Sequence, residues 1–567
     1  MRLKQSTIDA GFFGGLLAVV PLMLALGLAG NINAASLPSI IADAVASGES
    51  RIIIPPGQYR VTPQNREHLR LEGLRDVEIV AEGVEMICTQ TTRAITIKDC
   101  ADLTIRGLTI DYDPLPFTQG RIVATDSDTL TFEIIAGYPT QGIPHGGKVE
   151  VFNGQTDALR SHTYYGATTE PQGDGRFLVT KPRQFRGDQG EFQPQIGDTV
   201  VVNANHAPGG LIPHAVFVED SEGLTFEDVT LYAANMFGFL EIRTSGSVYR
   251  RCVVDRRPLA KDLKPRDHRR VRSLNADAFH SKSARIGPQY LDCVAKHQGD
   301  DSFAINGHYH LVTESAGSTL RVLGKRDGTI ELAVGEPVEL VRYTGERLPE
   351  AVVTAIVPDG SINDTEMSFL QEQRMHAGLK QRNGMLNDAY RVTLDRPIDL
   401  PIGSVITSRH QMGNGFVIEG CELGNNRSRG ILVKCSGIVR NNTITGTWGE
   451  AIKVAPEWWW LEAGHATDVR IEGNDIRDTR GIPIAVHSLS GTGEIAPAGA
   501  HRDVRITENR MADTPPPAIF VTSATGLTIE GNAIASHAAR RLFPWVANRY
   551  RLGHDPDDIT LVQTEDH

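Results

Sequence analysis

The clearest candidates for chemistry are carboxylates that stand directly before short apolar segments. Asp300 and Asp301 are adjacent in "GDDSFAING", and Asp277 holds the same place before the apolar residue of "NADAFH". Carboxylates that share a site raise one another's pKa, so one can hold a proton near neutral pH while another is ionised. A protonated acid beside an ionised carboxylate is the pair that hydrolysis of a glycosidic bond needs.

These acids belong to a repeat that runs along the chain. Segments such as "LTFEDVTL", "FVIEGCEL" and "LTIEGNAI" share one pattern of apolar and polar residues and recur every 21 to 35 residues, apart from two long interruptions. A second short segment with period two, such as "FLEI" or "AIFV", follows most copies. Short strands at this spacing predict a parallel β-solenoid, whereas a β-sandwich would not give this register. The last four copies place asparagines that can hydrogen-bond from rung to rung, namely Asn442, Asn474, Asn509 and Asn532.

The interruptions and the ends complete the predicted architecture. Residues 111–215 and 308–410 contain alternating runs that turn like hairpins, which predicts two small antiparallel β-barrels or sandwiches inserted into the solenoid. An amphipathic helix in "LPSIIADAVASG" and a tail from about Leu542 would cover the open ends. We therefore predict an all-β fold with these segments: leader (1–34), N-terminal cap and first coils (35–110), first insert (111–215), central coils (216–307), second insert (308–410), C-terminal coils (411–540) and terminal cap (541–567).

The repeat register places four charged residues in one column. Two residues before the apolar reference position of successive second strands stand Asp277, Asp301, Arg429 and Glu450. Burying four charges would carry a large desolvation cost, so the chain is expected to bend before each strand and send them to the surface edge. Neighbouring coils lie about 4.8 Å apart, and two carboxylates about 5 Å apart at an effective dielectric constant of ~20 repel by ~3 kcal/mol. One of the three aspartates should then hold a proton near neutral pH, unless Arg429 relieves the repulsion.

Other interpretations of these residues stay open. An Asp pair after Gly can make an Asx turn, and Glu450 with Arg429 can be a surface ion pair of little energetic consequence. Carboxylates at coil edges also fit a Ca²⁺ site. Because the acids form a column, we favour catalysis over each of these alternatives.

The segment "EAIKVAPEWWWLEAG" (450–464) adds candidates for sugar binding. Three consecutive tryptophans in a strand cannot all face one side, so at least one is expected to be exposed, while one or two others can seal a core. The histidines of "HYH" (308–310) fit a loop or wall better than a metal site. The predicted substrate-binding residues are Asn275, His280, Asn306, His308, Arg429, Glu450, Trp459, Trp460 and Glu462.

Charge and the N-terminus bound the partners and the location. The formal net charge is -12, and the one short basic run (261–272) fits a solvated loop, which argues against a nucleic-acid partner. Arg2 and Lys4 precede a long apolar run, and Ala34 could precede a cleavage site. This pattern predicts a signal peptide and export to the periplasm or beyond, with the membrane as a partner only if the segment stays uncleaved.

Six cysteines in an exported chain are compatible with disulfides. However, Cys252, Cys293 and Cys421 occupy one equivalent position of the repeat. Buried free thiols, stacked as small apolar residues, are therefore an equal alternative.

With these residues in hand, the chain resembles glycoside hydrolase family 110, the exo-acting α-1,3-galactosidases of bacteria. The resemblance depends on "DYDPLPFTQG", "NADAFH", "GDDSFAINGH", "RGILV" and "WWLEAG", which occur in order between about residues 38 and 535. More distantly, "NAD" followed by "GDD" resembles the "NTD" and "GDD" motifs of polygalacturonases. "SFAINGHY" replaces a smaller glycine-rich stretch and "WWWLEAG" is bulkier than the family's version, and both departures bear on the sugar preference more than on the hydrolytic chemistry.

The resemblance implies a right-handed parallel β-helix with inserted barrels, a galactose-containing glycan as substrate, an inverting mechanism and no metal or other cofactor. It implies that Asp277, Asp300 and Asp301 are catalytic. By analogy, Asp300 protonates the leaving oxygen, while Asp277 and Asp301 hold and deprotonate the attacking water. Inverting enzymes separate their carboxyl groups by roughly 6.5–9.5 Å and retaining ones by roughly 5 Å, so Asp300 must diverge from the other two. A pectate-type lyase and a non-catalytic carbohydrate-binding solenoid are the alternatives.

Overall fold

The computed structural model describes residues 36–160, 163–186, 190–207, 214–259, 269–325, 330–382, 384–535, 542, 544–552, 557–562 and 564. The predicted leader (1–34) and most of the basic run 261–272 lie outside the described residues. Within the described ranges, no helix has the length and apolar character needed to cross a membrane.

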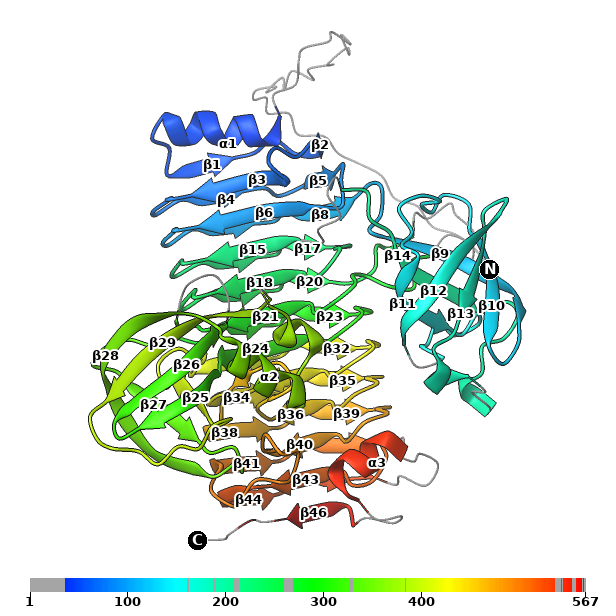
Figure 1. Cartoon of the computed structure of the whole chain (residues 1–567). Helices are drawn as coiled ribbons and strands as arrows, with labels where there is room; N and C mark the ends of the chain where they lie inside the picture. The colour runs from blue at the N-terminus through cyan, green and yellow to red at the C-terminus, as the bar shows by residue number, and fades with distance from the viewer. Residues whose placement is uncertain are drawn as a thin grey trace, which may run out of the picture.

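The rungs of the chain stack into a solenoid whose walls are three parallel sheets, which confirms the predicted fold class (Figure 1). Each rung contributes one strand to each sheet in turn. The first sheet contains β1 (Arg51–Ile53), β4 (Glu78–Val80), β7 (Thr104–Arg106), β16 (Thr225–Glu227), β19 (Val248–Arg250), β22 (Gln289–Leu291), β31 (Phe416–Glu419), β34 (Gly437–Arg440), β38 (Thr467–Glu472), β41 (His501–Thr507) and β44 (Ala524–Glu530). The second sheet contains β2 (Gly57–Val61), β5 (Val84–Cys88), β8 (Thr109–Tyr112), β17 (Thr230–Leu231), β20 (Val253–Val254), β23 (Val294–Lys296), β32 (Glu422–Gly424), β35 (Thr443–Thr445), β39 (Asp475–Arg477), β42 (Arg510–Ala512) and β45 (Ala533–Ile534).

The third sheet follows the second in every rung and carries the predicted acids. It contains β3 (Glu67–Glu72), β6 (Arg93–Lys98), β15 (Val216–Glu219), β18 (Phe239–Ile242), β21 (Phe279–Lys282), β24 (Phe303–His308), β33 (Ile431–Val433), β36 (Ile452–Val454), β40 (Ile484–Val486), β43 (Ile519–Thr522) and β46 (Ile559–Val562). A short strand, β37 (Glu462–Ala463), pairs antiparallel with the end of β24.

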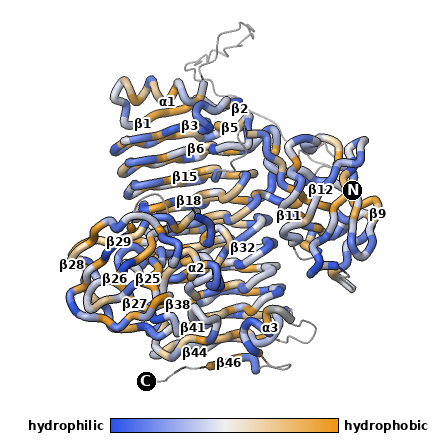
Figure 2. Tube along the Cα trace, in the orientation of Figure 1, coloured by the Kyte–Doolittle hydropathy of each residue, from blue (hydrophilic) through white to orange (hydrophobic). Residues whose placement is uncertain are grey.

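Period-two alternation sends one side chain of each pair into the solenoid. The rings of Phe239, Phe279 and Phe303 stack inside it, with 5.0 Å between successive centroids, an offset-stacking distance that adds to the free energy of burial. Polar residues alternate with these apolar ones along the rungs (Figure 2). In each of these strands the phenylalanine faces inward. The residue that follows it in the strand, such as His280 after Phe279, therefore faces outward.

An amide ladder holds the rungs of the C-terminal half in register. The Nδ2 of Asn442 donates to Oδ1 of Asn474, that of Asn474 to Asn509, and that of Asn509 to Asn532, at 2.9 to 3.0 Å. This confirms the predicted rung-to-rung hydrogen bonds. The amides of Asn442, Asn474 and Asn509 are buried, and each donates to the next one in the ladder, so the ladder avoids the cost of unpaired polar groups.

Thiols continue the ladder toward the N-terminus. Asn442 accepts a hydrogen bond from the backbone N–H of Cys421, and the Sγ of Cys421 accepts one from the backbone N–H of Cys293. All six cysteines are described, and all are buried and free. The structure therefore bears out the stacked-thiol alternative rather than a disulfide framework.

The two ends are closed differently. Helix α1 (Leu37–Ala46) is capped by the Ser36 side chain and buries Leu37 and Ile41 over the first rung, as predicted. At the other end, β46 adds the final strand to the third sheet. Helix α3 (Pro544–Tyr550) does not lie over that end, because Val546 and Tyr550 pack with Phe520 on the outer face of the third sheet.

Both inserts are closed six-stranded antiparallel barrels. The first barrel contains β9 (Phe117–Thr125), β10 (Thr129–Ile134), β11 (Gly146–Phe152), β12 (Tyr164–Gly173), β13 (Arg176–Thr180) and β14 (Thr199–Asn203), with short helices η1 (Arg183–Phe185) and η2 (Gly190–Phe192). The second contains β25 (His310–Ala316), β26 (Thr319–Lys325), β27 (Pro337–Val341), β28 (Arg347–Ser361), β29 (Leu386–Leu394) and β30 (Val405–Ser408), with α2 (Asp364–Glu372) and η3 (Ala377–Lys380). The first barrel interrupts the chain between β8 and β15, and the second between β24 and β31.

Candidate active site

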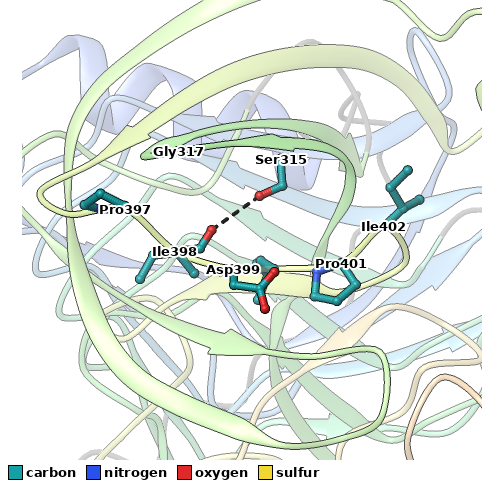
Figure 3. A pocket seen from close by; sticks show the side chains of 8 residues that line it. Ser315, Gly317, Pro397, Ile398, Asp399, Pro401 and Ile402 are labelled. Carbon is teal, nitrogen blue, oxygen red and sulfur yellow. Dashed lines mark hydrogen bonds between the residues drawn. The ribbon is translucent and has the colours of Figure 1, made fainter.

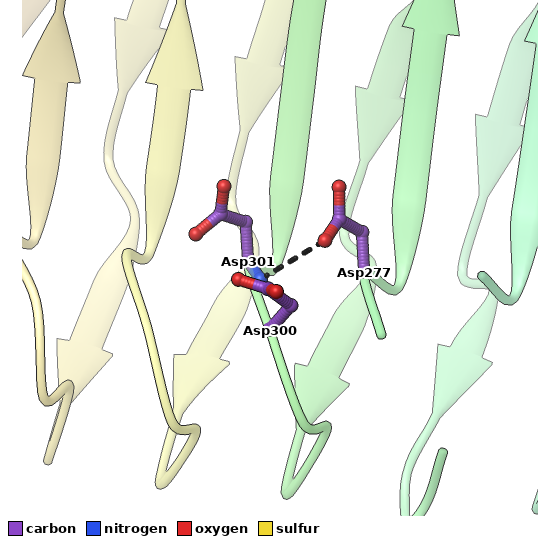
Figure 4. Close-up of side chains that lie close together, drawn as sticks. All are labelled: Asp277, Asp300 and Asp301. Atoms are coloured by element: carbon purple, nitrogen blue, oxygen red, sulfur yellow. Dashed lines mark hydrogen bonds between the residues drawn. The ribbon is translucent and has the colours of Figure 1, made fainter. Parts of the chain in front are cut away.

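The three predicted acids converge at the bends that precede β21 and β24 (Figure 4). One oxygen of each of Asp277, Asp300 and Asp301 lies within 4.8 Å of the others. The backbone N–H of Ala278 donates to the carbonyl of Asp301 at 2.9 Å, which places Asp277 and Asp301 on neighbouring rungs of one ladder. The predicted register produces this cluster. The expectation that the bend sends the whole column to the surface edge is wrong, because Asp277, Asp301 and Glu450 are buried and only Asp300 and Arg429 keep partial exposure.

The carboxylates differ in direction and exposure. In Figure 4, Asp277 and Asp301 point the same way, whereas Asp300 diverges from its neighbour. Asp277 and Asp301 are 5% and 2% exposed, and the side chain of Asp300 is 28% exposed. Asp300 is therefore the most accessible of the three acids, and it diverges from the buried pair.

Two arginines from the next rung neutralise part of the cluster. Arg429 donates from Nε to Oδ1 of Asp301 at 2.9 Å and its Nη2 lies 2.8 Å from Oδ2. Arg427 forms an ion pair with Asp300. Bidentate contacts of this kind fix both the charge and the orientation of a carboxylate.

The pKa values of the buried pair are raised, as the column predicted. Burial, with the charges of Asp301 and Asp300, raises the pKa of Asp277 well above its ordinary value. Burial also raises the pKa of Asp301, although Arg429 opposes this shift. Among the described residues, Arg429 pairs with Asp301 and Arg427 with Asp300, whereas no lysine or arginine pairs with Asp277, so the expected proton falls on Asp277.

Three of the predicted sugar-binding residues are buried and hydrogen-bonded within the protein. His280 and Asn306 are buried and hydrogen-bond to each other, and His280 also contacts Asp277. Asn275 is buried, donates to the carbonyl of Pro116 and accepts from Arg272. Because their polar groups are engaged within the protein, these residues are placed to support the acids rather than to contact a sugar.

A network of buried charges extends from Arg429 across the third sheet. Arg429 reaches Glu457 at 2.6 Å, and Lys434 lies 3.6 Å from Glu457 and 3.0 Å from Glu462. Lys282 reaches the other oxygen of Glu462 at 3.1 Å. The side chains of Arg429, Glu457 and Lys282 keep 16–17% exposure, so part of each remains accessible at the surface.

Glu450 and His308 are placed away from such a ligand. Tyr550 of α3 donates to Glu450 and covers it. Although burial favours the neutral form, Lys453 and Arg549 lower the pKa of Glu450 to about 2. His308 contacts Glu331 of the second barrel, which fits the wall role predicted for the "HYH" segment.

The three tryptophans separate as expected. Trp458 is buried in a core of the second barrel with Tyr309, whereas Trp459 is 51% exposed. The ring of Trp460 stacks on His376 with 3.9 Å between centroids. Trp459 is therefore the tryptophan that can offer a face to a sugar ring.

The first barrel contributes residues that sequence reasoning missed. Lys148 of β11 donates to the carbonyls of Asn275 and Gly299 at 2.8 and 2.6 Å, which fixes the backbone just before both acid positions. Tyr165 of β12 is half-exposed and lies over the Arg427 guanidinium at 5.5 Å. Neither residue belongs to the repeat, so no column in the sequence pointed to them.

A cation is a weaker interpretation of the cluster than catalysis. Three converging carboxylates offer oxygen ligands of the kind that Ca²⁺ prefers. However, Arg427 and Arg429 already occupy two of these carboxylates. Their guanidinium charges would repel a bound divalent ion.

A pocket lies on the second barrel, where the 397–402 segment passes Ser315 and Gly317 (Figure 3). Ser315 donates to the carbonyl of Ile398 across it. Asp399 is the one ionisable residue of its lining, so it lacks the paired acids that the cluster provides.

Comparisons with known proteins bear on the fold and on the class of enzyme. Residues 405–540 match a family model described as a right handed beta helix region. An alpha-1,3-galactosidase B of Bacteroides thetaiotaomicron is 23% identical over 84% of this chain and 76% of its own length. An alpha-1,3-galactosidase A of Shewanella woodyi is 22% identical over 78% of this chain and 70% of its own length. The predicted resemblance to α-1,3-galactosidases is confirmed. These relatives support the predicted enzyme class, a glycoside hydrolase.

Solved structures match at low scores. A polygalacturonase from Erwinia carotovora ssp. carotovora is 9% identical, with coverage of 94% of both chains and a TM-score of 0.37. The catalytic domain of a GH87 alpha-1,3-glucanase in complex with nigerose is 10% identical over 94% of this chain and 67% of that chain, with a TM-score of 0.34. No conclusion about function follows from scores this low.

Proposed function

We propose that the protein is an exported, exo-acting, inverting glycoside hydrolase that removes terminal α-1,3-linked galactose from oligosaccharides or polysaccharides. The observation that carries the proposal is the convergence of Asp277, Asp300 and Asp301 within 4.8 Å, with one member favouring its protonated form. The galactosidase relatives supply the sugar and the linkage.

The proposed reaction is a single displacement. Asp300, the most exposed acid, protonates the glycosidic oxygen as the bond from that oxygen to the anomeric carbon breaks. A water held by Asp277 and Asp301 attacks the same carbon from the opposite face and gives a proton to the buried pair. Water attack on the opposite face of the sugar yields the inverted anomer.

The surroundings suggest how a terminal galactose would be held. Arg429, Glu457 and Lys282 present charged tips that can hydrogen-bond to sugar hydroxyls. Tyr165 of the first barrel offers an exposed aromatic face beside Arg427, and Trp459 is a second exposed aromatic side chain, next to His376 of the second barrel. Polar contacts for hydroxyls and apolar faces for ring C–H groups are the combination expected in a sugar site.

The test is hydrolysis of a galactose-α-1,3-galactose disaccharide followed by ¹H NMR. Wild type should release galactose with the β-anomer first, and Asp301→Asn should be slower by roughly 10²–10⁴-fold. α-Galactose as the first product would exclude inversion, and equal rates would remove the cluster from the mechanism. Sugar binding without turnover would favour the carbohydrate-binding alternative. An unsaturated product, detected by its ultraviolet absorbance, would favour the lyase.

Export is a separate part of the proposal. The leader pattern supports it, and N-terminal sequencing of the protein from periplasmic and culture fractions tests it. Cleavage after Ala34 is expected; intact leader in a membrane fraction would show that the segment serves as an anchor.

A further inference from the structure

A hydrogen-bonded chain runs behind the acids along the outer face of the third sheet. The Nδ1 of His280 lies 2.7 Å from Oδ2 of Asp277, and its Nε2 lies 2.9 Å from Oδ1 of Asn306. All three side chains are buried, and Phe237 stacks on the imidazole at 5.0 Å. The imidazole is therefore held in one orientation between an acid and an amide.

The hydrogen bonds of Asn306 determine where the protons of His280 lie. The Nδ2 of Asn306 donates to the carbonyl of Gly307 at 2.8 Å, so its Oδ1 faces the imidazole. This oxygen can only accept, and Nε2 must therefore carry a hydrogen. In a neutral imidazole the other nitrogen, Nδ1, is then a lone-pair acceptor.

A contact of 2.7 Å between Nδ1 and a carboxyl oxygen needs a hydrogen between them. Either Asp277 is a carboxylic acid that donates to His280, or His280 is an imidazolium that donates to an ionised Asp277. In both cases the pair holds one proton more than an ionised acid beside a neutral imidazole.

The surrounding charges decide between the two forms. Asp277 faces the carboxylates of Asp301, Asp300 and Glu462 as well as the Arg429 guanidinium, and burial with the neighbouring aspartates raises its pKa. His280 faces Lys282 and Lys434 as well as Glu462, and burial together with the two lysines lowers its pKa well below the ordinary value. Both effects place the proton on the carboxyl group.

We infer that His280 and Asn306 are positioning residues that keep a proton on Asp277, which leaves Asp301 as the general base. This inference rests on the proposed function for the role of Asp301. In the step, the water oxygen bonds to the anomeric carbon and its proton passes to the Asp301 carboxylate. Asp277 keeps its own proton, and Asp300 gives a proton to the leaving oxygen, so the protons balance.

The direct test is ¹⁵N NMR of the full chain labelled at histidine, with the His280 signals assigned by their loss in His280→Gln. At pH 7, His280 should show a protonated Nε2 and an unprotonated, hydrogen-bonded Nδ1. Hydrogen on both nitrogens would place the proton on His280 and overturn the inference. Hydrogen on Nδ1 alone would overturn it as well.

A kinetic test compares Asn306→Asp with Asn306→Ser. A carboxylate at position 306 would stabilise the imidazolium, so Asp277 would ionise and add a negative charge beside Asp301. This charge raises the pKa of the base, and the acid limb of the kcat/KM profile should move upward by about one pH unit or more. The serine hydroxyl can accept from Nε2 without adding charge, so Asn306→Ser should keep the wild-type midpoint. Superimposable profiles for the two variants would contradict the inference.

The two tests separate this inference from the proposed function. The NMR measurement needs no substrate. An inactive protein with the expected His280 protonation would remove the hydrolase proposal and leave the proton on Asp277. An active enzyme with hydrogen on Nδ1 of His280 would support the hydrolase proposal and overturn the inference that Asp277 keeps the proton.

Discussion

The two inserted barrels share a six-stranded closed form but differ in where they join the rung. The first precedes a strand of the third sheet, and the second follows one (Figure 1). The acids lie before their strands, so the first barrel emerges at the acid-bearing edge. It delivers Lys148 and Tyr165 to that edge.

The second barrel makes contacts of another kind. Its buried Glu339 pairs with Arg347 and contacts His465 of the solenoid, and Glu331 contacts His308. Against Trp458 it forms an apolar core. These contacts anchor the barrel and the tryptophan segment. The comparison shows that the position of an insertion along the rung, more than the fold of the module, determines which barrel can influence the chemistry.

The largest expected difference is between Lys148→Met and Glu331→Gln. Lys148 fixes the backbone before both acid positions, so its loss should lower kcat on the disaccharide by roughly 10²-fold. Glu331→Gln in the second barrel should change kcat by less than about threefold and act on thermal unfolding instead. Matched rate measurements and melting curves check both, and a larger rate loss in Glu331→Gln would reverse the assignment of roles.

The next effect concerns the pH profile of Arg429→Met. Arg429 opposes the burial that raises the pKa of Asp301, so its removal should raise that pKa further. A base must be ionised to act, and the acid limb of kcat/KM should therefore move to higher pH, by about one unit. Arg347→Met, which lies at the second-barrel interface, serves as the control with an unchanged midpoint. A shift in the control alone would contradict the prediction.

Tyr165→Ala should produce a smaller, substrate-dependent effect. If the first barrel holds the leaving-group sugar, losing an aromatic face worth about 1 kcal/mol should raise KM for the disaccharide by roughly fivefold. An aryl α-galactoside, which lacks that sugar, should be affected less. Trp459→Ala is the matched variant on the second-barrel side. Equal losses on both substrates would show that Tyr165 only supports Arg427.

Chelation should have the smallest effect. Two arginines supply positive charge at the cluster, so dialysis against EDTA should change kcat/KM by less than about twofold. Assays with and without added Ca²⁺ check this. A large loss that Ca²⁺ restores would favour the metal interpretation of the three carboxylates.

Much of the fold followed from one-dimensional periodicity. The column of Asp277, Asp301, Arg429 and Glu450 was readable because each rung repeats the same offset between turn and strand. Apolar alternation likewise predicted the strands. The asparagine column predicted its own rung-to-rung hydrogen bonds, because each amide side chain can both donate and accept.

What the sequence could not supply were contacts between non-repeating segments. Lys148 and Tyr165 lie more than a hundred residues before Asp300, inside a barrel whose docking depends on three-dimensional shape. Glu450 was assigned to the sugar site because nothing in its rung indicated that α3 would fold back over it. The burial of His280 and Asn306 was hidden for a related reason, because the outer face of a strand shows its polar residues without showing what covers them. Asn275 lies in the bend before β21, where the repeat likewise does not show that Arg272 and Pro116 bind its amide.

The row of unlinked thiols has a consequence for how the protein can be made. No sulfur–sulfur bond has to form among the six cysteines, so the fold can mature without an oxidant or a disulfide isomerase. Expression in a reducing bacterial cytoplasm, without the leader, should yield material with the same melting temperature as protein recovered from the periplasm.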